Sequence, residues 1–229
     1  MENLTLVIPA KNEGSCLPQV LDELKKFECK KLIIVDKNDI GTISAIENKN
    51  CEILKQKTSG YGNALIEGIN HVKTPFMCIF NADGSFDPKY LSEMLNKIVE
   101  ENNDFIFASR YLQNAGSDDD TFITLLGNKI FSFIGNLFFK LRLTDILYTF
   151  VMGKSDKFKE LYLKNSDFRI CVEIPIKIKN QNLSFDSIPS FERSRISGKK
   201  KVNALLDGSL ILIEMIKLFF MSKKNPNDQ

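Results

Sequence analysis

The sequence predicts an α/β protein built on a mostly parallel β-sheet flanked by helices, and two observations carry this prediction. Short apolar runs with the length of buried strands alternate with segments whose apolar residues recur at helical spacing. Polar or glycine-containing turns follow the apolar runs, which is where ligands bind at the carboxyl ends of parallel strands. The composition, 43% hydrophobic and 26% charged residues over 229 positions, is that of a globular protein rather than a disordered one.

The first half of the chain alternates regularly between the two kinds of element. Strands are expected over residues 4–9, 31–36, 51–56, 75–83 and 104–111. Helices are expected over residues 17–27, 60–72 and 88–99, where Pro88 suits the first helical turn.

The second half is richer in Phe, Leu and Ile. It predicts a long helix over 122–143 and shorter helices over 156–163 and 170–179. An extended segment over 183–193 contains Pro189 and therefore suits a sheet edge. A final amphipathic helix is expected over 202–221.

Composition excludes several classes of function. A net charge of +2 gives no reason to expect a nucleic-acid partner. The five cysteines are scattered and lack CxxC spacing, so we expect no disulfide framework, no zinc site and a reducing cytoplasm. The chain starts with a strand-like run and no charged leader, so we do not expect a secreted precursor.

The most informative segment is FNADGSFDP, residues 80–88, in which a carboxylate follows a buried strand and precedes a glycine turn. Together with IPAKNE (8–13), IIVD (33–36) and SGYGNALIEGI (59–69), it resembles the nucleotide-sugar glycosyltransferases of family 2. Within that family the chain is most similar to the polyprenyl-phosphate sugar synthases of the dolichyl-phosphate mannose synthase type.

This resemblance implies a GT-A (Rossmann-like) fold followed by C-terminal amphipathic helices. It implies one catalytic domain over 1–229, with a nucleotide-sugar-binding half (1–112), an acceptor-binding half (113–201) and an amphipathic helix with a tail (202–229). It also implies an inverting transfer of a hexose from a UDP- or GDP-sugar to a polyprenyl phosphate, as in cell-envelope biosynthesis.

The resemblance assigns the nucleotide sugar to residues beyond the first strands. Asp36 would hold the nucleoside, although a turn-capping role is also open because the turn reads VDKND instead of VDDGS. Gly60 and Gly62 would let backbone approach the nucleotide, or would only form a tight turn. The remaining donor contacts would come from Pro9, Asn12 and Glu13.

Asn81 and Asp83 stand where the family carries its D-x-D motif. Hard oxygen ligands suit Mg²⁺ or Mn²⁺, and the ion would also bind the donor diphosphate. Because Asn81 offers only an amide oxygen, we expect metal binding and catalysis to depend on Asp83.

The acceptor side is assigned from weaker matches. Arg110, in a GSRY-like strand end, and Asp145 are expected to act with Asp83 in catalysis, and Arg110 to grip a phosphate. The other phosphate or acceptor contacts would come from Lys129, Glu173, Arg193, Arg195 and Lys199. For Glu173 a structural ion pair is equally open, as is a solvated basic loop for the arginines.

Three departures keep other functions open. Asn81, Thr149 and Val151 replace an acid, a glycine and an arginine of the family pattern, which would suit a weakened relative that binds nucleotide sugar. Transfer to a sugar hydroxyl in surface-polysaccharide assembly is a second alternative. We favour the lipid phosphate because the sequence offers no strong general base, and an anionic phosphate needs none.

Two apolar stretches suggest contact with a membrane surface, but neither is expected to span the membrane. Lys129 interrupts the first stretch, and Glu214 and Lys217 interrupt the second, so we expect no transmembrane helix. Residues 131–139 and 211–220 are nevertheless more apolar than one core face needs. They either lie peripherally on the inner face of the cytoplasmic membrane, bury each other, or form a seam in a homo-oligomer.

Overall fold

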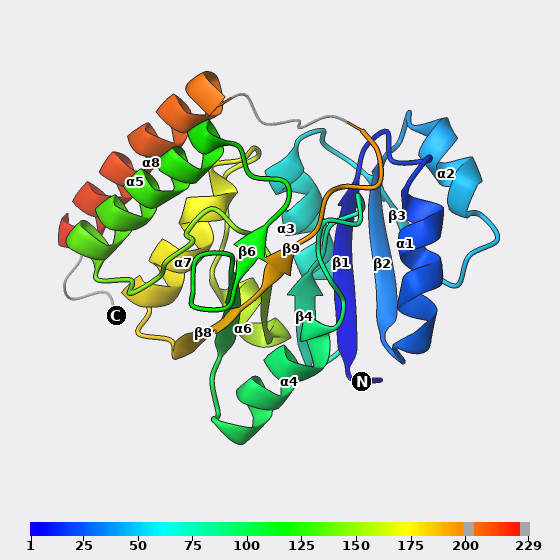
Figure 1. Ribbon diagram of the computed structural model, residues 1–229, viewed down its shortest axis with the longest axis horizontal. Helices are drawn as coiled ribbons and strands as arrows, with labels where there is room; N and C mark the ends of the chain where they lie inside the picture. The colour runs from blue at the N-terminus through cyan, green and yellow to red at the C-terminus, as the bar shows by residue number, and fades with distance from the viewer. Residues whose placement is uncertain (199–203, 225–229) are drawn as a thin grey trace.

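The centre of the molecule is a seven-stranded, mostly parallel β-sheet with helices on both faces (Figure 1). The computed structural model describes residues 1–198 and 204–224. The strands of the sheet are β1 (Leu4–Ala10), β2 (Lys30–Asp36), β3 (Glu52–Gln56), β4 (Phe76–Ile79), β5 (Phe105–Ser109), β7 (Val151–Lys154) and β8 (Phe185–Pro189). Two short strands, β6 (Gly116–Ser117) and β9 (Phe191–Glu192), pair with each other outside it.

The strand order is β3-β2-β1-β4-β7-β5-β8. All neighbouring pairs are parallel except those of β7, which runs antiparallel to β4 and β5. The carboxyl ends of the six parallel strands therefore lie at one edge of the sheet, and the loops that follow β1, β2, β4, β5 and β8 meet there. The expected mostly parallel α/β architecture is confirmed, with β8 as the expected edge strand.

The helices are α1 (Leu17–Glu23), α2 (Ile40–Ile46), α3 (Tyr61–His71), α4 (Tyr90–Glu100), α5 (Phe122–Phe139), α6 (Ser155–Glu160), α7 (Ile170–Asn180) and α8 (Ala204–Lys224), with a 3₁₀ turn over Leu24–Lys26. The first core contains side chains of α1, α2 and α4. The second contains side chains of α3, α6 and α7, and also of α5 and α8. The central strands are buried on both faces, which explains their continuous apolar runs.

Two elements differ from the sequence expectation. Helix α2 forms where none was expected, because Asp39 accepts a hydrogen bond from the Thr42 backbone N–H and caps its first turn. Strand β7 lies in the middle of the sheet, where Gly153 meets the ring of Phe105 so closely that a Cβ would be 2.5 Å from Cδ1. Val151, read from the sequence as a missing cation, is a buried residue of this strand.

Candidate functional site

The loop after β1 is held against the start of α2. The Asn12 backbone N–H donates to Asp39 Oδ2 (2.6 Å), and the Glu13 backbone N–H donates to Thr42 Oγ1 (2.9 Å). Asn12 has a positive φ of 55°, and the Glu13 side chain accepts a hydrogen bond from the Cys16 thiol (2.9 Å). Burial, and then the neighbouring Glu13, raises the pKa of Cys16 to about 11, so this thiol stays protonated. The loop is thus fixed before any ligand arrives.

Asp36 ends β2 beside this loop and is only partly buried. Its Oδ1 accepts from the Asn38 backbone N–H (3.0 Å), and its Oδ2 lies 3.4 Å from Ser59 Oγ. The hydrogen bond from Asn38 therefore orients the Asp36 carboxylate at the carboxyl end of β2, where the sequence predicts a nucleoside contact. Pro9, by contrast, lies within β1, in register with Ile34 of β2.

Gly60 and Gly62 have a packing role within the chain. A Cβ on Gly60, whose φ is +127°, would lie 2.3 Å from the Ser166 carbonyl oxygen, and one on Gly62 would lie 2.0 Å from the Asn165 carbonyl oxygen. The Ser166 carbonyl also accepts hydrogen bonds from the backbone N–H groups of Gly62 (2.9 Å) and Asn63 (3.2 Å). The glycines therefore admit the chain's own 165–166 segment at the start of α3, and their contact with a nucleotide stays a prediction.

Replacing Gly62 by alanine is expected to destabilise the protein by about 1–3 kcal/mol, because the new methyl group overlaps backbone that cannot rotate away. Urea unfolding monitored by circular dichroism measures the change. Gly127→Ala is the matched control: a Cβ at Gly127, within α5, meets nothing within 4 Å, so it is expected to stabilise the helix by about 0.5–1 kcal/mol. Equal effects at both positions would contradict the packing role of Gly62.

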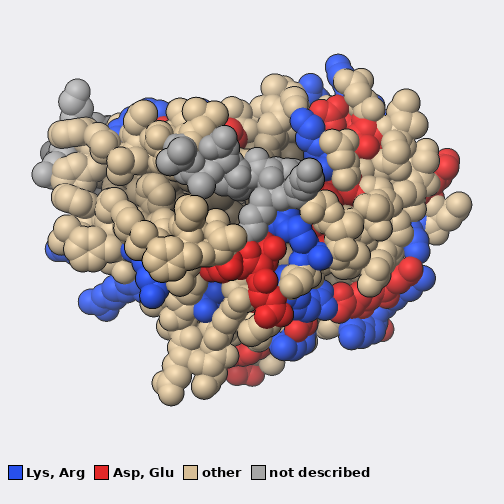
Figure 2. Space-filling view, turned by 45° about the horizontal axis from the view of Figure 1, so that its top comes forward, with Lys and Arg blue, Asp and Glu red and all other residues tan. Residues whose placement is uncertain are grey.

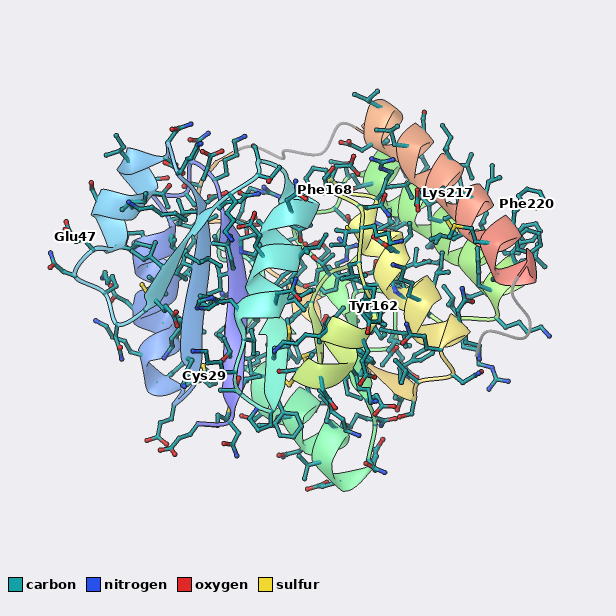
Figure 3. The ribbon with its side chains drawn as sticks, turned by 180° about the vertical axis from the view of Figure 1, so that it is seen from behind. Cys29, Glu47, Tyr162, Phe168, Lys217 and Phe220 are labelled. Atoms are coloured by element: carbon teal, nitrogen blue, oxygen red, sulfur yellow. The ribbon has the colours of Figure 1, made fainter. Side chains whose placement is uncertain are left out.

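Glu173 on α7 anchors this same segment. It is 2% exposed, and its carboxylate accepts from the backbone N–H groups of Lys164 and Asn165 (both 2.9 Å) and pairs with Lys177 (2.7 Å). Burial alone would raise the pKa of Glu173, but Lys177 and the Asn165 N–H outweigh it and hold that pKa below its usual range. Phe168, which Figure 3 labels, stacks on Tyr61 of α3 with ring centroids 4.9 Å apart. The ion-pair alternative is the one that the contacts of Glu173 favour.

The turn after β4 brings Asn81 and Asp83 together through Ser85. Asn81 Nδ2 donates to Ser85 Oγ (3.1 Å), and Ser85 donates both its hydroxyl (2.7 Å) and its backbone N–H (3.0 Å) to Asp83 Oδ1. Within the described residues, this leaves Asn81 Oδ1 and Asp83 Oδ2 without a short hydrogen bond. Two hard oxygen atoms on one turn fit Mg²⁺ or Mn²⁺ when a diphosphate supplies further ligands. Among residues 1–198 and 204–224, no group of three or more His, Cys, Asp or Glu side chains could hold a metal alone.

Residues 193–197, which we call the strap, run across this turn after β9. The Arg193 backbone N–H donates to the Ser85 carbonyl (2.9 Å), and the Ile196 backbone N–H donates to the Asp83 carbonyl (2.8 Å). The Ile196 side chain packs over Gly84, which has a φ of +82°. At the far end, Ser197 Oγ hydrogen-bonds Ser15 Oγ (2.7 Å). The strap thus joins loops from three strands at the sheet edge.

The two arginines of the strap have different partners. Arg193 forms a bidentate pair with Glu23 (2.7 and 2.9 Å) and donates to the carbonyls of Gly84 and Phe86, so its role is to hold the strap. Arg195 pairs with Asp119 (2.8 Å), while its Nη1 lies 3.5 Å from Asp83 Oδ2. Arg195 is therefore the cation directed at the candidate metal turn.

Arg110 lies in a buried network of acids. It donates from Nε and Nη2 to Asp145 (2.7 and 2.8 Å) and from Nη1 to Glu192 (3.0 Å), with Asp120 at 3.4 Å. Its guanidinium carbon is also 4.4 Å from the centroid of the Tyr148 ring. The side chain of Asp145 is fully buried and that of Arg110 is 8% exposed. Arg110 and Asp145 are thus brought together as predicted, but the guanidinium binds carboxylates of this chain rather than an open phosphate site.

Glu192 is the second buried acid that contacts Arg110 in this network. Its Oε2 accepts from Ser117 Oγ (2.6 Å) as well as from Arg110. Burial raises the pKa of Glu192 above its usual range in spite of both donors. On the surface drawn in Figure 2, acidic and basic side chains lie side by side near the middle of the face.

One of the expected phosphate ligands lies away from this cluster, and another is not described. Lys129 is exposed on α5, on the same side as the apolar residues described below. Lys199 lies outside the described residues. Thr149, the other departure from the family pattern, donates to or accepts from the Tyr61 hydroxyl (3.0 Å) and so serves the packing of α3.

Sequence reasoning missed Asp39, Ser85, Asp119 and Glu192. Asp39 carries a local signal, since it precedes isoleucines at helical spacing and is a favoured N-cap residue. Ser85 lies inside the recognised motif, where its hydroxyl joins the two candidate metal ligands. Asp119 and Glu192 carry no local signal, because their partners are 76 and 82 residues away in the chain.

Comparison with known proteins gives a family match. The profile of glycosyl transferase family 2 matches residues 5–162. An uncharacterised protein of Methanocaldococcus jannaschii is 25% identical over 195 residues, which are 82% of this chain and 80% of that protein. An uncharacterised glycosyltransferase of Mycobacterium tuberculosis is 31% identical over 98 residues, but the match spans only 40% of this chain and 43% of that protein.

Solved structures share the fold at low sequence identity. Mannosyl-3-phosphoglycerate synthase from Rubrobacter xylanophilus superposes with a TM-score of 0.69 at 15% identity, covering 99% of this chain and 76% of that one. Glucosyl-3-phosphoglycerate synthase from Mycobacterium tuberculosis, in complex with Mn²⁺, UDP and glucosyl-3-phosphoglycerate, superposes with a TM-score of 0.72 at 11% identity, covering 94% and 79%. The fold of this chain is therefore the GT-A fold.

Proposed function

This chain belongs to glycosyl transferase family 2, and on that premise we propose that it transfers a hexose from a UDP- or GDP-sugar to a polyprenyl phosphate, with inversion at the anomeric carbon. The choice of a phosphate acceptor is supported mainly by the pairing of the acidic side chains at this edge of the sheet with arginines. Asp83, Asp119, Asp145 and Glu192 all face an arginine within salt-bridge distance. Carboxylate oxygens that contact an arginine are occupied by it and are not free to accept the proton of an acceptor hydroxyl. A phosphate acceptor is already anionic and needs no base.

The donor would lie over the strand ends between Asp36 and Asp83. Asp36 is available to a ribose hydroxyl or a base N–H, beside the fixed loop that contains Asn12 and Glu13. Asn81 and Asp83 would hold Mg²⁺ or Mn²⁺, which offsets negative charge on the departing diphosphate. Mn²⁺ accompanies UDP in the mycobacterial neighbour, which supports the same ion class here. Arg195, whose Nη1 lies 3.5 Å from Asp83 Oδ2, would add a second positive charge near the diphosphate.

A hydroxyl acceptor is the second candidate, and Glu192 is the observation that favours it. A raised pKa brings a carboxylate closer to the range in which it accepts a proton at neutral pH. The neighbours named above act on 3-phosphoglycerate, a soluble molecule. A sugar or phosphoglycerate hydroxyl would then need Glu192 as its base.

The two candidates are separated by their acceptors. The protein is incubated with UDP-glucose or GDP-mannose, Mn²⁺ and a short polyprenyl phosphate, with the polyprenol of the same length as the matched control. Labelled lipid product with the phosphate and none with the alcohol is the expected result. Product with 3-phosphoglycerate or a sugar hydroxyl, lost in Glu192→Gln and absent with the lipid phosphate, would replace the proposal by the second candidate.

A further inference from the structure

Helix α5 buries its small and polar residues and exposes its apolar ones. Asn128, Ser132 and Gly135 are buried together with Phe139. The opposite side of the helix exposes apolar residues at the spacing of one helical face, namely Phe122, Leu126, Ile130, Phe133 and Leu137. This is the reverse of the arrangement in a helix that covers the core of a water-surrounded domain.

Helix α8 likewise exposes apolar residues on its outward side, although its inward side is mainly apolar. Its inward side includes Glu214, which is 3% exposed, together with Ile211, Met215 and Leu218. Its outward side carries Ile213, Ile216, Phe220 and Met221. Figure 3 shows Phe220 at the outer edge of α8, near Lys217.

The two helices lie side by side and form one surface (Figure 1). A Cβ on Gly208, near the start of α8, would meet the ring of Phe131 in the middle of α5. Farther along both helices, Phe219 contacts the rings of Phe138 and Phe139. The helices thus bury part of each other, as one alternative from the sequence expects, yet their outward sides stay exposed. Figure 2 shows a broad uncharged region at this end of the molecule.

The charges around this surface are positive. Lys129 and Lys217 are exposed on the two helices, and Lys140 and Arg142 are exposed directly after α5. Helix α5 carries no acid, and the described part of α8 carries two: half-buried Asp207 and buried Glu214, which pairs with Lys217 (3.4 Å). An apolar stripe edged by exposed cations complements a bilayer with anionic headgroups.

By length and composition α5 could also cross a membrane, contrary to our expectation from Lys129. Its mean hydropathy is 1.4 over 18 residues, of which 22% are buried. However, α5 packs against α8 and α7 in the folded domain, and crossing would remove Ser132, Gly135 and Phe139 from those contacts. The packing therefore favours a helix that lies along the surface.

From these observations we propose that the outward sides of α5 and α8, which we call the apolar face, bind the surface of an anionic lipid bilayer. The inference extends the proposed function, because a polyprenyl phosphate resides in the same bilayer. The apolar residues enter the headgroup region, and the lysines contact lipid phosphates.

Cosedimentation with vesicles tests the apolar face directly. The full chain is mixed with vesicles of phosphatidylglycerol and phosphatidylcholine, or of phosphatidylcholine alone, without donor or acceptor. We expect binding to the anionic vesicles that weakens, without vanishing, as salt is raised. The double variant Ile130→Glu, Phe133→Glu should bind at least about tenfold more weakly, because two charges enter the apolar stripe.

The matched control is Val99→Glu, since Val99 is also an exposed apolar residue (61%, against 49% for Ile130 and 65% for Phe133) but lies on α4. It should bind as the unmodified chain does. No binding by the unmodified chain, or equal loss in both variants, would overturn the proposal. A dimer in ultracentrifugation that the double variant dissociates, with no vesicle binding, would identify a contact between two copies instead.

The two proposals can fail separately. Turnover of a water-soluble, short-chain polyprenyl phosphate does not require vesicles, so the double variant should keep this activity if only the membrane contact is lost. Vesicle binding without any turnover of the lipid phosphate would retain the apolar face and reject the proposed acceptor.

Discussion

The Asp83→Asn variant is expected to lose transferase activity by about two to three orders of magnitude, the cost of removing one electrostatic contact to a departing anion. The substitution keeps an oxygen that can accept the two hydrogen bonds from Ser85, so the turn should retain its shape. It removes the negative charge that a divalent cation needs. We expect kcat to fall and the dependence of the residual rate on Mn²⁺ to flatten.

The measurement is initial rate against Mn²⁺ concentration at saturating donor. Asp156→Asn is the matched control, because Asp156 is an exposed acid on α6, next to the opposite edge of the sheet. It should leave both the rate and the metal dependence unchanged. Activity of the Asp83 variant within about threefold of the unmodified enzyme, a difference below about 1 kcal/mol, would remove Asp83 from the reaction.

The Arg110→Met variant is expected to lose about 3–5 kcal/mol of stability at pH 7.5, because it leaves buried carboxylates without their cation. Asp145 is fully buried, and Glu192 already has a raised pKa through burial. In the variant both acids should bind protons more readily in the folded state than in the unfolded chain. Stability is then gained as the pH falls, so the deficit should shrink at pH 5.

Urea unfolding at pH 7.5 and pH 5 measures both effects. The control is Arg142→Met, which removes an exposed arginine just after α5 and should change stability by less than about 0.5 kcal/mol. A deficit that is the same at both pH values would show that the loss arises from packing against Tyr148 and not from charge.

The elements that the sequence predicted well are those with a strong local pattern. Strands β1, β2 and β4 and helix α4 are contiguous apolar runs or clear helical stripes, and they form within a few residues of the expected bounds. Strand β7 escaped prediction because it has four residues and is defined by its partners β4 and β5. Nothing local in Val151–Lys154 separates such a strand from a loop.

The residues of the candidate site also differ in how well the local sequence predicts their position. Asp83 and Asp36 were predicted because a carboxylate at the end of a buried strand has a position that the sequence itself defines. Glu192, one partner of Arg110, and the 165–166 segment that packs on Gly60 and Gly62 lie more than eighty residues away in the sequence. The sequence around Arg110, Gly60 and Gly62 was therefore also consistent with ligand contacts. Such residues were assigned to ligands when their partners lie within the protein.

The carbonyl of Ser166 has a consequence for how a donor can be held. Nucleotide sites that open on a glycine turn commonly use the first free amides of the next helix as an anion cradle. In this protein two of those amides, at Gly62 and Asn63, are already satisfied by the chain itself. On the proposed function, side chains and a dissociable cation would neutralise the pyrophosphate, and donor affinity would be sensitive to chelators in a way that a helix-terminus cradle would not be.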